Sequence, residues 1–189
     1  MTPDIQALVN QLDAADRDAE SLVSGMTQAQ AAWQPASGSW SVAECLDHLG
    51  LTHHIYIADM EQAATRGRAQ GKMRRGPARP GLGGGLFARL MEPPVRQRFR
   101  IKAPEIIQPK SIPTIAQALA GFLASQQEVR NFLLSNAELD LAGIRFVHPF
   151  IPGLRFSLAS GLSIILAHDR RHLWQARRAR EAAFGLQSP

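Results

Sequence analysis

The sequence predicts an all-α protein, a four-helix bundle with a long crossover between its second and third helices. Three observations support this fold. Four segments carry apolar residues at helical spacing, capping signals mark the helix starts, and no segment shows the alternation of a strand. A chain of 189 residues can bury a core of its own. We therefore expect one domain over residues 1–189, with 71–113 as a long basic connection.

The first predicted helix begins at Thr2, an N-cap followed by proline at the first helical position, and it ends before Ser24–Gly25. Its apolar residues recur at helical spacing: Ile5, Leu8, Val9 and Leu12. A capping box of the form T-x-x-Q over residues 27–30 then opens a short helical turn. Pro35 and Gly38 end this turn, which we interpret as a connector.

The second predicted helix begins at a capping box over residues 41–44 and runs to about Arg68. Its apolar residues form one stripe: Val42, Leu46, Leu49, Tyr56, Ile57 and Met60. A third capping box, over residues 114–117, opens the third helix, which ends near Asn136. The fourth helix spans about Ser157 to Ala183 and follows a turn-rich stretch over residues 148–153.

Residues 71–113 break the helical pattern, because seven of the twelve prolines and a glycine-rich run over 81–85 fall there. We predict a long connection with one helical turn near residues 86–91, one that adds little to the core. Residues 66–110 hold twelve Lys or Arg and two acidic residues, a net charge of +10, whereas the rest of the chain carries −5. Such a segment attracts anions, and we expect it to border a homodimer contact or to attract an anionic substrate.

Other features restrict the class of protein. No apolar stretch is long enough to span a bilayer and no leader pattern is present, so we expect a cytoplasmic protein that does not contact membranes. Nucleic acid is a poor fit for the basic segment, whose aromatic residues are only Phe87 and Phe99. Cys45 is the single cysteine, which excludes an internal disulfide and a cysteine-based zinc site. Any metal must therefore rest on histidines and carboxylates.

The histidines are the candidate ligands, and His168 and His172 are the most informative of the six. They lie one turn apart on an inward helix face, opposite a row of arginines, so they could share one metal ion. The alternative is a pair of hydrogen-bonded core histidines. The protease motif H-E-x-x-H does not apply, since aspartate stands where that motif needs glutamate. A third ligand could come from His48, His53 or His54, and helical spacing does not decide among them.

Three motifs together resemble the DinB-like superfamily of four-helix bundles. They are W-S-x-x-E-x-x-x-H-L over residues 40–49, H-P at 148–149, and H-D-R-R-H-L-x-Q over 168–175. More narrowly, the chain is similar to the branch related to bacillithiol transferases and metal-dependent hydrolases. The resemblance implies that His48, His168 and His172 bind the metal and that His53 and His54 do not. The basic segment over residues 66–110 matches nothing in this pattern.

Three imidazoles with an open position are typical of a catalytic zinc-type site. The resemblance therefore implies a metal-dependent enzyme, either a thiol S-transferase that uses a low-molecular-weight thiol or a hydrolase. We expect Zn or Ni, with Fe or Cu also compatible with imidazole ligands. Two alternatives stay open: a metal-binding bundle without catalysis, and binding of an anion, nucleic acid or partner through residues 66–110.

Several residues near these motifs have both a functional and a structural interpretation. Glu44 fits its capping box better than a role in orienting His48, and Cys45 fits a small core residue. Asp169 and Gln175 could steady the imidazoles or bond a neighbouring helix. Trp40 and Trp174 are interpreted as packing residues at the end of the bundle. For His148 two alternatives stay open: it lines the mouth of the pocket, or it is an exposed loop histidine.

Overall fold

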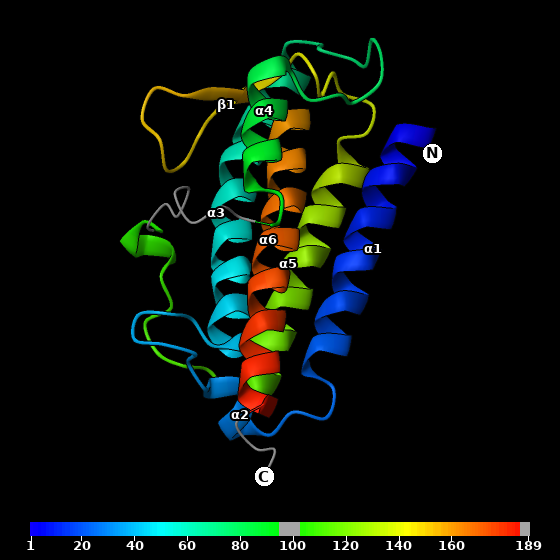
Figure 1. Cartoon of the computed structure of the whole chain (residues 1–189). Helices are drawn as coiled ribbons and strands as arrows, with labels where there is room; N and C mark the ends of the chain where they lie inside the picture. Colours follow the sequence, from blue (N-terminus) through cyan, green and yellow to red (C-terminus); the bar gives the residue numbers. More distant parts are fainter. Residues whose placement is uncertain (95–102, 186–189) are drawn as a thin grey trace.

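The computed structural model describes residues 1–94 and 103–185, and it is mostly helical. Four long helices lie side by side (Figure 1): α1 (Pro3–Val23), α3 (Val42–Ala69), α5 (Ile115–Ser135) and α6 (Leu158–Gly185). Shorter elements connect them: α2 (Gln28–Ala32), α4 (Leu82–Met91), the 3-10 helix η2 (Glu105–Ile107), and the strands β1 (Arg145–Val147) and β2 (Arg155–Ser157). The prediction of a mainly helical protein is confirmed, and the expectation of no strand is wrong.

Each of the four long helices packs against two of the others. Helix α3 lies against α5 and α6, and α1 lies against the same two helices. The buried apolar side chains form two clusters, and each contains residues from all four long helices. One cluster surrounds Met60 and Leu162, and the other surrounds Leu46 and Leu173. In α3, α5 and α6, the stretch between the two clusters contains buried polar side chains: His53, Gln126 and Asp169.

The capping boxes determine three helix starts. Thr27, Ser41 and Thr114 each accept a bond from the backbone N–H three residues later, and the side chain there bonds back to the cap. Helix α1 begins with Pro3 at its first position and has no side-chain cap bond. The helix boundaries predicted from these signals agree with the structure within about two residues, because capping is a local interaction.

Helix α4 corrects the prediction for the connection between the second and third long helices. It has ten residues, where one turn was expected, and it includes the glycine run. A Cβ atom on Gly84 would overlap the side chain of Ser160 on α6, so glycine permits the close approach of these two helices. Ala88 is also buried in this contact. The expectation that the connection adds little to the core is therefore wrong for α4.

The strands form a short antiparallel hairpin before α6 (Figure 1). Phe146 pairs with Phe156, and both side chains are buried against the helices. The turn closes with a bond from the His148 N–H to the Leu154 carbonyl, and Gly153 adopts a φ of 78° that favours glycine. Among the described residues, no helix is both long and apolar enough to cross a membrane.

Candidate metal centre

Three histidines from two helices meet inside the molecule. His48 lies on α3, and His168 and His172 lie one turn apart on α6. Their candidate ligand atoms all lie within 4.8 Å of one another. His48 and His172 are buried and His168 is half-buried. The set that the sequence motif singled out is therefore brought together by the packing of α3 on α6.

The backbone of η2 determines which nitrogen of His48 faces its neighbours. Nδ1 of His48 lies 2.7 Å from the carbonyl oxygen of Ile107. A carbonyl only accepts, so the ring proton is on Nδ1 and the lone pair is on Nε2. Nε2 lies 3.3 Å from Nε2 of His168. Metal-ligating histidines usually make such a hydrogen bond through the ring nitrogen that does not bind the metal, and this bond fixes the tautomer.

Burial keeps the three imidazoles neutral. Loss of hydration lowers the pKa of His48 to about 4. The pKa values of His168 and His172 lie well below the ordinary value, first because of burial and then because of their histidine neighbours. A hydrogen bond with Gln175 opposes the shift of His172. Since metals bind the neutral form, these three residues are ready to coordinate at neutral pH.

The donor set fits a divalent transition metal. Nδ1 of His168 and Nδ1 of His172 are both buried without a hydrogen-bond partner in the part of the chain that the structure describes, so neither nitrogen is committed to a protein group. Three neutral nitrogen donors suit Zn, Ni, Fe or Cu. Among residues 1–94 and 103–185 the group includes no fourth histidine, cysteine or acidic ligand. The three histidines could hold a metal ion and leave a position open.

The family comparison agrees with this geometry. A family model described as the DinB superfamily matches residues 11–176, most of the chain. The chain belongs to the DinB superfamily. Neither curated proteins nor solved structures gave a match. The predicted family is therefore confirmed, and the matched residues of this DinB protein include all three histidines of the cluster.

Trp40 forms a wall of the site. Its ring centroid lies 4.5 Å from that of His48 and 5.6 Å from that of His172. The sequence interpretation made Trp40 a packing residue at the end of the bundle. In the DinB protein it packs directly on two of the candidate ligands, so it shields them from water on that side. Trp174 stacks with Arg178 instead.

The other two histidines of α3 lie apart from the cluster. His53 is fully buried, with Nδ1 2.9 Å from Oγ of Ser125 and Nε2 2.7 Å from Oδ1 of Asp169. His54 is exposed and lies 2.6 Å from a carboxylate oxygen of Glu128. Of the two roles considered for Asp169, the bond to a neighbouring helix is the one observed.

The structural interpretations hold for two residues and fail for a third. Glu44 completes its capping box and also accepts bonds from Gln34. Cys45 is fully buried, and burial raises the pKa of its thiol. His148 is buried, although an exposed loop position was one of the alternatives for it. Its Nδ1 accepts from two backbone N–H groups of the hairpin turn, and its Nε2 lies 2.8 Å from the Tyr56 hydroxyl.

Sequence reasoning missed the Ile107 carbonyl, because a backbone group carries no residue signature. It also missed Tyr56 as the partner of His148.

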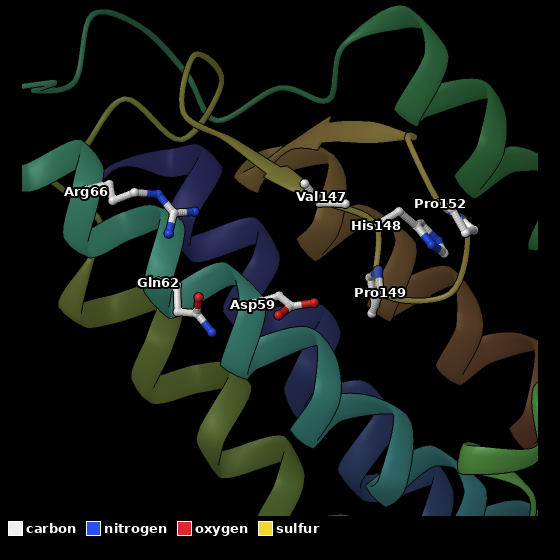
Figure 2. A pocket seen from close by; sticks show the side chains of 7 residues that line it. All are labelled: Asp59, Gln62, Arg66, Val147, His148, Pro149 and Pro152. Carbon is white, nitrogen blue, oxygen red and sulfur yellow. The ribbon is translucent and has the colours of Figure 1, made fainter.

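A surface cavity of about 380 Å³ lies beside His148, between α3 and the hairpin (Figure 2). Its lining residues include none of the three clustered histidines: Asp59, Gln62, Arg66, Val147, His148, Pro149 and Pro152. The cavity is therefore separate from the candidate metal centre.

Proposed function

We propose that this DinB protein is a four-helix bundle that binds one divalent metal ion through His48, His168 and His172. We further propose that it is a metal-dependent enzyme, either a thiol S-transferase or a hydrolase. The supporting observation is the convergence of three neutral imidazoles from α3 and α6, with no fourth ligand in the described part of the chain. A structural zinc site is normally closed by a fourth protein ligand, so an open triad favours chemistry.

The surrounding residues have separable roles in this proposal. The Ile107 carbonyl keeps His48 in the tautomer that presents Nε2. Trp40 covers His48 and His172 and excludes water from that side. His168 is the least buried of the three, so a small molecule approaches from its side. A divalent ion with three imidazole ligands supplies Lewis acidity that activates a water molecule or a thiol.

Non-catalytic metal binding is the second candidate, and one observation favours it. Two carboxylates close in sequence to the triad are engaged elsewhere: Glu44 caps α3, and Asp169 binds His53 and Gln126. A third, Asp47, directly precedes His48, whose ring nitrogens lie against Ile107 and His168 instead. None of the three is hydrogen-bonded to a clustered histidine in the described part of the chain. The described residues therefore include no carboxylate hydrogen-bonded to the triad that could act as its general base.

The expected metal is Zn or Ni, with Fe or Cu also compatible with the ligands. The expected substrate is an anionic small molecule, with a low-molecular-weight thiol as co-substrate in the transferase case. A cytoplasmic homodimer completes the proposal. Three leucines on α4 support a dimer contact, because they follow each other at a spacing of four residues and are exposed: Leu82, Leu86 and Leu90.

Elemental analysis combined with a screen for thiol transfer and hydrolysis tests the proposal. We expect about one metal ion per chain in the parent protein and in His54→Gln, a histidine variant on the same helix. His48→Gln should lose the metal, because its amide cannot replace a neutral imidazole ligand. Metal without turnover would favour the non-catalytic candidate. A metal-free parent protein that takes up no added Zn²⁺ or Ni²⁺ would contradict both.

A further inference from the structure

A buried polar network lies next to the histidine cluster, and the proposed function does not use it. Asp169 follows His168 on α6 and is fully buried. Its Oδ1 accepts from Nε2 of His53 on α3 at 2.7 Å, and its Oδ2 accepts from the side-chain amide of Gln126 on α5 at 3.0 Å. His53 is in turn held by Ser125 at 2.9 Å. All four side chains are buried.

We propose that this network positions helix α6 so that His168 and His172 face His48. In this role Asp169 and His53 are positioning residues, and neither touches the metal. The inference rests on the proposed function, because it concerns the affinity of the three-histidine site. It goes further by assigning the geometry of that site to residues outside it.

The connectivity of Asp169 supports this role. One carboxylate on α6 is bonded both to α3, which carries His48, and to α5, which also packs against α3. The residue that makes these bonds is the immediate neighbour of a candidate ligand. Rotation of α6 about its axis, or sliding along it, would break both bonds. The carboxylate therefore fixes the orientation of the turn that contains His168.

The tolerance of a metal site makes such a constraint important. An atom at the outer radius of a helix lies about 5 to 6 Å from the axis, so a rotation of about 10° moves it by about 1 Å. Metal–ligand distances vary by only about 0.2 Å. Small freedom in the rotation of α6 is thus enough to move an imidazole out of coordination.

Apolar packing alone gives a weaker constraint on this face of α6. The buried apolar residues next to the ligands include Ile165, Leu173 and Ala176, and their packing contacts are non-directional. Burying a carboxylate is unfavourable unless it is fully hydrogen-bonded, and here both oxygens are bonded. Directional bonds of this kind can specify one arrangement of packed helices, which is what a three-ligand site requires.

Binding of Co²⁺, followed by its visible absorption, tests the proposal. Asp169→Ala removes both bonds and should weaken Co²⁺ binding roughly ten- to hundredfold and change the absorption bands. Asp169→Asn should bind Co²⁺ with an affinity within about threefold of the parent's, because the hydrogen bonds of residue 169 determine the affinity. Its oxygen can accept from His53, and its amide can donate to Oε1 of Gln126 once the Gln126 amide turns over, because that oxygen has no partner among the described residues.

Tyr56→Phe is the matched control, because it removes a buried hydrogen bond of α3 that does not involve the network. It should lower the thermal midpoint and leave Co²⁺ affinity and absorption unchanged. If Asp169→Ala does not fold, Gln126→Met decides, since it removes one of the two bonds and keeps the side-chain volume. That variant should bind Co²⁺ at least about threefold more weakly.

The outcomes separate this inference from the proposed function. A folded Asp169→Ala with the parent's affinity and absorption would overturn the inference and leave the metal site standing. Equal loss of affinity in Tyr56→Phe would also overturn it, because the effect would then follow stability alone. A parent protein that binds no Co²⁺, Zn²⁺ or Ni²⁺ would overturn the proposed function and this inference with it.

Discussion

Replacing His148 by asparagine should make the protein lose less stability than the parent when the pH is lowered from about 7.5 to about 5.5. Burial lowers the pKa of His148 to about 4 from the ordinary 6.5. The neutral ring is held by two backbone N–H groups at Nδ1 and by Tyr56 at Nε2. In the unfolded chain the ring takes up a proton near its ordinary pKa, whereas in the folded chain it does not.

The sign and the size of the effect follow from this difference. Because the folded protein binds fewer protons, the contribution of His148 is complete above about pH 6.5 and is lost as the pH falls toward 4. The difference between the two pKa values corresponds to a loss of about 1.3 kcal/mol in the free energy of unfolding between about pH 7.5 and about pH 5.5.

Urea unfolding of the metal-free protein at these two pH values, followed by circular dichroism, measures the effect. Asparagine places an oxygen near the position of Nδ1, so it can still accept from the hairpin turn while no longer titrating. The two proteins differ only at position 148, so the difference between their losses of stability isolates the contribution of His148. The parent should therefore lose about 1.3 kcal/mol more than His148→Asn. Equal losses in the two proteins would refute the buried, neutral assignment of His148.

Three other predictions concern the packing of α4, the wall of the site and the oligomeric state. Gly84→Val should lower the free energy of unfolding by about 1–3 kcal/mol, since its side chain would overlap Ser160; an unchanged urea midpoint would contradict the close contact. Added Cu²⁺ should quench tryptophan fluorescence in the parent and in Trp174→Phe but much less in Trp40→Phe, and equal quenching in all three would place the metal elsewhere. Serine at all three exposed leucines of α4 should shift the sedimentation profile toward the monomer, and an unchanged profile would exclude that contact: Leu82, Leu86 and Leu90.

The parts of the fold that the sequence predicts are those that local interactions determine. Capping boxes at Thr27, Ser41 and Thr114 locate helix starts, because each depends on residues three positions apart. The hairpin escaped prediction, since strands of three residues are too short to show alternation. Helix α4 was predicted only as a single turn for another reason: glycine is a poor helix former, and the contact of Gly84 with α6 is a tertiary interaction.

In the candidate site, too, local spacing predicts some of the residues, and tertiary packing determines the others. Spacing alone pairs His168 with His172, because residues four apart share a helix face. The choice between His48 and His53 depends on how α3 is rotated relative to α6, which is a tertiary property. The motif resemblance supplied that choice, and the structure places His48 with the pair and His53 with Asp169. The Ile107 carbonyl depends on the path of the chain before α5 and could not be predicted.

The two apolar clusters on either side of the polar stretch have a consequence for how the proposed metal would be acquired. Each cluster draws on all four long helices and contains none of the three clustered histidines. Both ends of the helix assembly are thus held together without an ion, unlike small zinc domains that are unfolded until metal binds. If the triad binds a metal as proposed, metallation would be a binding event on an already folded protein. The ion could then exchange, and its identity would follow the cell's supply of competing cations.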